Sequence, residues 1–536
     1  MNYRYKFAVV VATVWVLSIS FHRRIVTIPT FANFMKICDT MEPEGKTKSK
    51  ITQLQEEVDK VFNKFDSMIP KIIFSHLDNT TSPQNSRATM INPKEKYCVG
   101  DSLIVRVDMF DHLAKRKCHG GDFLMARIYS PDIQASASGR IEDLGNGSYN
   151  INFTLFWQGT VHFSILLIHP SEGVSALWQA RNKGHGYVAY TGYFMNHGKE
   201  AKTKCSFDLN KTLELCDYSD LKEEEYFYCV KPENISCGSL VKMKSVFVDT
   251  HSYLSILEKA LFDRSNMRIE IPKTFEKISV FNCGNIITEK KQKCSTGIKY
   301  QFPGGYSYRN MWNHLVCNIS RYRTMDAINE CIKGKIIYLT GDSTMLQWMT
   351  YLTSNVNSLK PFNLYGENWP MTRLYIDMER NAKIQWTKHG NPFIMLVFHT
   401  FKEEFTIPHQ IDQIGGNKHT VVALTLGMHF RLFPIQHFIR RVINIKRAIE
   451  RLLLRSPETK VIIKTENTSE MNVRVEMLSD FHGYLHYLII NYIFQDINVG
   501  VVDAWDMTNA FASEQIHPPT EIISNEIDLL LSYACI

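Results

Sequence analysis

Hydrophobic and polar residues alternate along much of the first third of the chain. Two runs show this most clearly, Leu103 to Met109 and Tyr149 to Leu155, in which every second residue is apolar. A period of two is typical of strands with one buried face, and Gly145-Asn146-Gly147 between the runs favours a turn. The pattern predicts a β-sandwich of immunoglobulin-like type over residues 72–195.

The pattern changes after residue 283, where strand-like apolar runs alternate with helical periodicity. Between two of these runs, apolar side chains from Ile435 to Leu453 recur at helical spacing behind Pro434, and proline is favoured in the first turn of a helix. Strands separated by helices predict an α/β domain over 283–536, with three layers and a mostly parallel sheet. The strand candidates are 335–340, 393–398, 420–426, 460–464 and 499–503.

Three further segments complete the predicted domain organisation. Residues 196–282 contain several cysteines and are interpreted as a connector. Residues 25–71 form a stem, whose amphipathic helix packs either on its own domain or on a second copy. Residues 1–24 contain an apolar run flanked by basic residues, which indicates a signal-anchor or a cleaved signal peptide. We favour an anchor that leaves the rest of the chain in the lumen.

Cysteines and glycosylation sequons indicate the secretory pathway. The chain has twelve cysteines. None forms a Cys-x-x-Cys pair, so disulfides of undetermined connectivity are expected and no metal site is. Seven asparagines stand in acceptor sequons. They are Asn79, Asn146, Asn152, Asn210, Asn234, Asn318 and Asn467.

The charge pattern adds little to this picture. A net charge of +7 is spread along the chain in short clusters, which are typical of a solvated surface. The sequence contains no nucleic-acid-binding motif and no phosphate-cradling loop, so neither a nucleic-acid partner nor a bound nucleotide cofactor is expected.

A candidate nucleophile stands where a buried strand meets a helix. Gly341-Asp342-Ser343 follows the apolar strand 335–340 and precedes a helix that starts near Met345. A serine in this position is exposed at the carboxyl edge of the sheet, with its backbone N–H near a helix N-terminus that stabilises an oxyanion.

A serine needs a histidine base, and that histidine needs a carboxylate. His517 is the predicted base. Its orienting carboxylate is Glu514, three residues earlier, or Asp506 or Asp503 just beyond the last predicted strand.

A third block ends another predicted strand. In Leu426-Gly427-Met428-His429-Phe430-Arg431, a glycine lets the backbone approach a substrate. His429 is either a donor to an oxyanion or substrate, or a packed histidine.

These blocks, in this order, resemble the esterase and acyltransferase superfamily named for its Ser-Gly-Asn-His blocks (SGNH), and within it the PC-esterase group. With His169-Pro170-Ser171-Glu172-Gly173 in the sandwich and Val502 to Met507 near the end, nearly the whole chain resembles the neurexophilin and PC-esterase domain (NXPE) family. Two positions depart from the pattern: His429 replaces the usual Asn, and Glu514 replaces the usual Asp.

The resemblance implies a lumenal glycan O-acyltransferase or esterase. It would move an acetyl group onto or off a hydroxyl of sialic acid or a related glycan, with acetyl-CoA as a possible donor and no bound cofactor. Ser343 would carry the acyl group, His517 would act as base and acid, and Gly427 would line the oxyanion hole. The expected location is the Golgi lumen, as a single-pass type II membrane protein, or alternatively the cell exterior.

The altered blocks leave a second hypothesis open. The sandwich resembles neurexophilin, a secreted binding module. The chain would then be a secreted or membrane-tethered binding protein with an inert esterase-like domain and a partner for its β-sandwich. Transferase and esterase also stay open, because the acyl-enzyme step is common to both.

Overall fold

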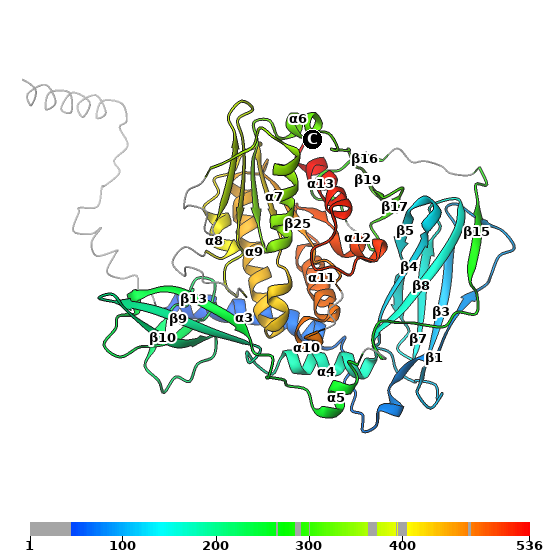
Figure 1. The fold of residues 1–536 in the computed structure, drawn as a ribbon, viewed down its shortest axis with the longest axis horizontal. Helices are drawn as coiled ribbons and strands as arrows, with labels where there is room; N and C mark the ends of the chain where they lie inside the picture. The colour runs from blue at the N-terminus through cyan, green and yellow to red at the C-terminus, as the bar shows by residue number, and fades with distance from the viewer. Residues whose placement is uncertain are drawn as a thin grey trace, which may run out of the picture. The chain divides into compact units, whose positions relative to one another are not determined.

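The computed structural model describes residues 44–263, 266–284, 291–299, 301–362, 372–392, 394, 405–469 and 473–535 (Figure 1). The chain divides into two units, Met1–Gln55 and Glu56–Ile536. The predicted anchor over 1–24 lies outside the described residues, as does nearly all of the predicted strand 393–398. None of the helices in the described ranges is both long enough and apolar enough to span a bilayer.

The predicted stem helix packs on its own chain. α3 (Glu44–Asp66) buries Val58 and Phe65, and its Phe62 stacks on Trp178. Glu57 also pairs with Arg447 at 2.7 Å. The periodicity left two alternatives, packing on its own domain or on a second copy, and these contacts show the first.

Two sheets form the N-terminal sandwich, and their strands pair antiparallel except for β2, which pairs parallel with β15. Val105 and Ile151 of the first sheet share one fully buried core with Ile128 and Ile165 of the second. The first sheet has the order β1-β3-β7-β6 and comprises β1 (Thr81–Ile91), β3 (Ser102–Asp111), β6 (Arg140–Asp143) and β7 (Ser148–Thr154). The alternation in the sequence marks the inward positions of these strands.

The second sheet draws on sequence far beyond residue 195. Its order is β18-β17-β5-β4-β8-β15-β2, and β14 also pairs with β8. Four of these strands (β14, β15, β17 and β18) come from the segments predicted as connector and C-terminal domain. The strands are β2 (Tyr97–Cys98), β4 (Phe123–Ser130), β5 (Ala135–Ser138), β8 (Gly159–His169), β14 (Ile269–Glu270), β15 (Lys277–Phe281), β17 (Gly305–Tyr308) and β18 (Met311–His314).

Much of the predicted connector is itself a sheet. Its order is β11-β12-β10-β9-β13, all antiparallel, and two disulfides join its strands and the following turn. The elements are β9 (Val188–Asn196), β10 (Lys199–Ser206), β11 (Leu215–Asp217), β12 (Tyr228–Val230) and β13 (Leu240–Phe247), flanked by α4 (Ser171–Arg181) and α5 (Ile256–Ala260).

A seven-stranded sheet organises the C-terminal part. Its order is β21-β22-β23-β20-β24-β25-β26, parallel from β23 to β26, with β21 and β22 antiparallel at one edge. The strands are β20 (Ile336–Thr340), β21 (Lys360–Pro361), β22 (Arg373–Asp377), β23 (Ala382–Thr387), β24 (Thr420–Leu424), β25 (Lys460–Lys464) and β26 (Gly500–Val502).

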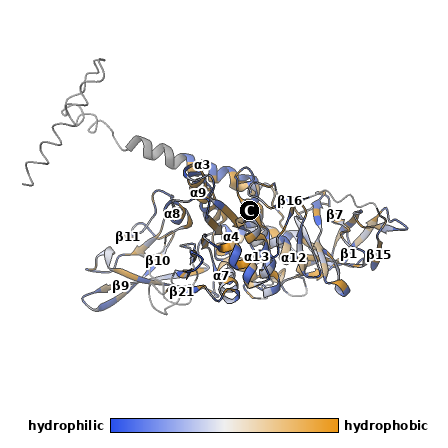
Figure 2. Ribbon diagram, turned by 90° about the horizontal axis from the view of Figure 1, so that it is seen from above, coloured by the Kyte–Doolittle hydropathy of each residue, from blue (hydrophilic) through white to orange (hydrophobic). Residues whose placement is uncertain are grey.

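Helices cover the centre of this sheet. Ile337 and Ala423 share a core with α7 and α13, while the alternate residue Val422 is also buried, so both faces are covered. Figure 2 shows the ribbon coloured by hydropathy, with apolar residues in orange. The helices are α6 (Met325–Ile332), α7 (Ser343–Asn355), α8 (Ile407–Asp412), α9 (Ile435–Arg455), α10 (Val475–Leu478), α11 (Asp480–Phe494), α12 (Ala504–Phe511) and α13 (Thr520–Ala534).

Short elements fill the connections. β16 (Gln292–Lys293) pairs with β19 (Cys317–Asn318), and single 3₁₀ turns occur at η1 (Leu77–Asn79), η2 (Pro131–Ile133), η3 (Cys237–Ser239) and η4 (Met428–Leu432).

Five disulfides join ten of the described cysteines. Cys118 is exposed and outside any disulfide. The pairs are Cys98–Cys283, Cys205–Cys229, Cys216–Cys237, Cys294–Cys317 and Cys331–Cys535. Disulfides persist in oxidising compartments, so this set indicates the secretory pathway.

Candidate active site

The turn that carries Ser343 is fixed by its two preceding residues. A Cβ on Gly341 would lie 2.6 Å from Thr425 Cγ2, so only glycine fits there. Asp342 caps α7, because its Oδ1 accepts hydrogen bonds from Thr344 N at 2.9 Å and Thr344 Oγ1 at 2.7 Å. Ser343 is therefore the first residue of α7, at the carboxyl end of the central strand β20.

The structure brings Ser343 and His517 together. Ser343 Oγ lies 2.7 Å from His517 Nε2, although the two residues are 174 positions apart. His517 is in the loop between α12 and α13, and its ring is exposed while Ser343 is half-buried. The distance is within the range needed for direct proton transfer between a hydroxyl and an imidazole.

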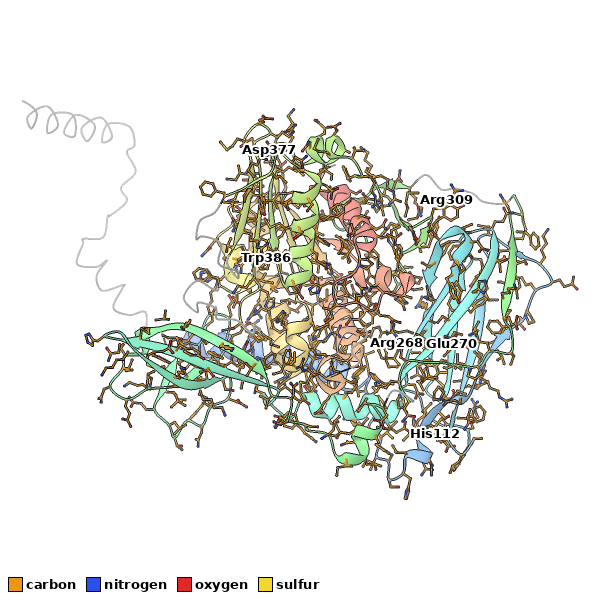
Figure 3. The ribbon with its side chains drawn as sticks, viewed as in Figure 1. His112, Arg268, Glu270, Arg309, Asp377 and Trp386 are labelled. Atoms are coloured by element: carbon orange, nitrogen blue, oxygen red, sulfur yellow. A yellow bond between two sulfur atoms is a disulfide. The ribbon has the colours of Figure 1, made fainter. Side chains whose placement is uncertain are left out.

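None of the three predicted carboxylates contacts His517 within the described part of the chain. Glu514 Oε1 instead lies 3.5 Å from Arg268 Nη2, because that guanidinium faces the loop from beside β14. Arg268 is labelled in Figure 3. Glu514 is therefore a surface partner of Arg268 in this structure and does not orient His517.

Asp506 and Asp503 serve buried backbone and hydroxyl groups. Asp506 Oδ2 accepts from Gly304 N at 2.7 Å and Gly305 N at 3.3 Å, and Asp503 Oδ1 accepts from Thr465 Oγ1 at 3.1 Å. Burial raises the pKa of Asp506 to about 6 and raises the pKa of Asp503 as well. These carboxylates hold the 304–305 turn and the end of β25, which explains why they do not reach the histidine.

Gly427 lies against the residue that precedes Ser343. A Cβ at position 427 would be 1.6 Å from Asp342 Oδ2, so no side chain fits. Among the described residues, neither the Gly427 N–H nor the Ser343 N–H donates a hydrogen bond. Two unpaired N–H groups near a nucleophile can stabilise an oxyanion.

His429 is engaged by the protein. Its Nδ1 accepts a hydrogen bond from Ile394 N at 3.0 Å, and its ring centroid is 5.2 Å from that of His389. Desolvation lowers the pKa of His429, while nearby Asp342 acts in the opposite direction. The contact with Ile394 favours the packed alternative for this histidine.

Gln347 is a site residue that the sequence analysis missed. It lies one turn after Ser343 on α7, and its Nε2 donates a hydrogen bond to Pro518 O at 3.1 Å. Pro518 follows His517 directly, so this bond ties the histidine loop to the serine helix. Spacing of i and i+4 on one helix face was the only available signal.

A buried ionic network supports the third block. Arg431 Nε donates to Glu466 Oε1 at 2.7 Å, and Glu466 Oε2 accepts from His486 Nδ1 at 2.9 Å. His486 Nε2 in turn lies 2.7 Å from Arg181 Nη2, while Arg181 Nε donates to Phe433 O at 2.9 Å. The network joins α4 to the segment around η4. Its members are too far apart in sequence to be grouped from spacing alone.

A cavity of about 440 Å³ opens beside the Ser343–His517 pair. Side chains from α7 line it together with His517, Thr520 and Ile523. No group of three or more potential metal ligands occurs among the described residues.

The glycosylation sequons differ in accessibility. Asn152 is half-buried, and Asn467 is buried with its Oδ1 accepting from Lys464 Nζ at 2.9 Å. A glycan on Asn467 is incompatible with this packing, which corrects the expectation for that position. The exposed positions are Asn79, Asn146, Asn210, Asn234 and Asn318.

Two solved structures show only weak similarity to this chain. The Lin-41 filamin domain is 17% identical with a TM-score of 0.13, over 16% of this chain and 82% of that chain. Invasin, a bacterial integrin-binding protein, is 10% identical with a TM-score of 0.14, over 57% of this chain and 61% of that chain.

Two protein-family models match the chain in succession. A neurexophilin model matches residues 71–252, and a model described as the NXPE family member 4-like C-terminal domain matches residues 312–535. The second match contains Ser343, Gly427 and His517, and the first contains most of the sandwich strands and the whole five-stranded sheet. With a neurexophilin segment followed by an NXPE C-terminal domain, the chain belongs to the NXPE family.

Proposed function

We propose that this chain is a lumenal glycan O-acyltransferase or esterase of SGNH type that works through a Ser343-linked acyl-enzyme. The observation that carries the proposal is the 2.7 Å contact between Ser343 Oγ and His517 Nε2 at the mouth of a cavity. The target is a hydroxyl of sialic acid or a related glycan. The setting is the Golgi lumen, with residues 1–24 as the membrane anchor.

In the first half-reaction, His517 Nε2 removes the proton from Ser343 Oγ as the oxygen attacks the acyl carbonyl. In this proposal the N–H groups of Ser343 and Gly427 stabilise the resulting oxyanion. The carbon–leaving-group bond then breaks, and His517 returns its proton to the leaving group. With acetyl-CoA as donor, the leaving group is the CoA thiol.

In the second half-reaction, the acceptor hydroxyl gives its proton to His517 and attacks the acyl-enzyme. The ester to Ser343 breaks, and the serine recovers the proton. A glycan hydroxyl as acceptor gives transfer, and water gives hydrolysis. The two activities differ only in which acceptor reaches the cavity.

The test is the O-acetyl content of glycans from cells that express the protein. Wild-type chain should change that content, and Ser343→Ala should abolish the change while the variant is secreted or retained like wild type. In vitro, a fluorophosphonate probe should label Ser343 in the wild type only. Full activity of Ser343→Ala would refute the catalytic assignment.

A second candidate is a binding protein whose esterase-like domain is inert. It is favoured by the neurexophilin match over 71–252 and by the lack of a carboxylate partner for His517 among the described residues. It predicts that wild type and Ser343→Ala give the same glycan profile and that the folded protein resists the probe. Probe labelling of Ser343 would exclude this candidate.

A further inference from the structure

The cavity beside Ser343 continues along the helix that carries the serine. Six side chains after the nucleophile line it from α7, at positions i+3, i+4, i+7, i+8, i+11 and i+12. They are Leu346, Gln347, Thr350, Tyr351, Ser354 and Asn355. At a rise of about 1.5 Å per residue, this wall extends about 18 Å from the reacting oxygen. The cavity is therefore an elongated groove, which we name the α7 groove.

The α7 groove has polar but uncharged side chains along its described lining. Thr350, Ser354, Asn355 and Gln347 offer hydroxyl and amide groups, and Thr520 adds a hydroxyl. Among the described residues that line the groove there is no Asp, Glu, Lys or Arg, and the only ionisable ones are Tyr351 and the candidate base His517. Burial raises the pKa of Tyr351, so its phenol is neutral.

One cation that contacts a lining residue, Arg323, is already paired with a carboxylate. Arg323 interacts with the Tyr351 hydroxyl, but its Nη2 is 2.8 Å from Asp528 Oδ2 and also donates to Asn525 Oδ1 at 2.9 Å. Arg323 is not a lining residue of the groove. A carboxylate or phosphate placed along α7 would therefore lose water without gaining a free counter-charge.

Apolar atoms nevertheless make up most of the exposed lining surface of the groove. Tyr351 supplies an amphipathic ring face, and Leu346 and Ile523 supply aliphatic side chains. An acyl chain would leave the surrounding hydroxyl and amide groups unpaired, which costs free energy. A saccharide, with hydroxyls on its edges and C–H faces for the tyrosine ring, matches both kinds of group.

We propose that the α7 groove is an acceptor subsite for a chain of uncharged sugar units, which extends away from the hydroxyl that reacts at Ser343. The inference rests on the proposed function and adds to it the class of substrate segment bound along α7. Any carboxylate of the reacting sugar and the phosphates of a CoA donor lie outside the groove.

The experiment compares two acceptors with acetyl-CoA as donor: the methyl glycoside of sialic acid, and a sialylated tetrasaccharide whose other sugars are uncharged. Ser354→Trp, at an exposed position near the end of α7, fills the groove. It should raise the KM of the tetrasaccharide about tenfold, a change of about 1.4 kcal/mol. The KM of the methyl glycoside and both kcat values should stay within about twofold of wild type, well under that 1.4 kcal/mol.

The matched control is Leu454→Trp, which adds a tryptophan at another exposed helical position, 85% accessible and not among the lining residues. It should leave both acceptors unaffected. An equal effect of Ser354→Trp on the two acceptors, or no effect on either, would overturn the subsite. So would an altered preference among acetyl-, butyryl- and hexanoyl-CoA at constant acceptor KM, which would assign the groove to the donor.

Failure of the proposed chemistry can be told apart from failure of the subsite. If wild type acetylates neither acceptor, the desialylated, uncharged oligosaccharide is titrated into wild type and Ser354→Trp by calorimetry. Binding to wild type that Ser354→Trp abolishes would support the groove and refute only the catalysis. Absence of binding to wild type would overturn both.

Discussion

His517 contacts Ser343 through Nε2, and its Nδ1 has no hydrogen-bond partner among the described residues. The imidazolium formed when it accepts the serine proton is therefore stabilised by solvent, since its ring is exposed. A buried carboxylate would normally orient the ring and offset that charge. Here orientation has to come from the backbone on either side of the histidine.

Glu514 is expected to contribute little to catalysis. Glu514→Gln should lower kcat less than about threefold, because its side chain is 54% exposed and faces Arg268. Loss of an orienting carboxylate would instead cost about 10⁴-fold. The kcat of steady-state acetyl transfer decides between these values. Arg268→Met is the matched variant, because it removes the partner of Glu514. A loss near the larger value would show that Glu514 turns to His517 during turnover.

Gln347 is expected to position His517. Gln347→Leu removes the hydrogen bond to Pro518 O and should lower kcat about 10- to 100-fold, since small misplacements of a catalytic group have effects of this size. Acceptor KM and the unfolding midpoint should change little. Gln347→Lys, which keeps a long donor, should recover part of kcat. A selective rise in KM, with kcat unchanged, would mark Gln347 as a binding residue only.

The sequence pointed to some of these residues and not to others, for a physical reason. Gly341, Ser343 and His517 were identified because a strand-to-helix turn and a histidine loop constrain the local backbone. The direction of the Glu514 side chain depends on Arg268, 246 residues away, and no local spacing encodes that contact. Gln347 was missed because it acts on a backbone carbonyl that has no signature in sequence.

Among the elements, α13 connects the site to the end of the chain. It begins at Thr520, three residues after His517, and Cys535 at its end is bonded to Cys331 at the end of α6. Its Glu526 accepts from Trp348 Nε1 of α7 at 2.6 Å. The position of the histidine loop therefore depends on how firmly α13 is held.

Removal of the Cys331–Cys535 disulfide should destabilise this arrangement. The double variant Cys331→Ser with Cys535→Ser is expected to lose about 2–5 kcal/mol of unfolding free energy, because the bond closes a long loop. Urea unfolding measures the loss. Fluorophosphonate labelling of Ser343 should slow in parallel if α13 loosens. Cys118→Ser, outside any disulfide, is the control and should match wild type.

The longest periodic elements were predicted best. The runs 335–340, 420–426 and 460–464 coincide with β20, β24 and β25, and the helix after Pro434 is α9. Strands of two to four residues, such as β14 and β17, are too short to show a period. The short charged clusters were interpreted as solvated surface, yet Arg441 of α9 is buried and paired with Glu225 of the predicted connector.

At the scale of the molecule, a buried histidine links the sandwich to the C-terminal part. His169, at the end of β8, is 3% exposed and lies 2.7 Å from Ser479 Oγ at the start of α11. Burial lowers its pKa from the ordinary value of 6.5 to about 3. Below pH 6.5 the unfolded chain binds a proton at this residue that the folded chain does not bind.

Acidification should therefore destabilise the protein through His169. At pH 5 His169 is still unprotonated in the folded state. Its titration therefore lowers the free energy of unfolding at pH 5 by about 2 kcal/mol relative to pH 7. His169→Gln cannot bind the proton and should show a smaller loss of unfolding free energy between pH 7 and pH 5. Asp506, whose pKa is raised to about 6, acts in the opposite direction in both proteins and cancels in the comparison. Equal pH dependence in the two would contradict the prediction.

The strand order of the second sandwich sheet means that this sheet can be completed only late in synthesis of the chain. β5 pairs with β17, and β8 with β14 and β15, so their partners are made only after the entire five-stranded sheet. Until then β5 and β8 expose unpaired edges, which invite pairing between chains. A nascent or truncated chain ending near residue 252 would thus be aggregation-prone and dependent on chaperones. The segment that the neurexophilin model matches therefore ends before the four strands that complete this sheet.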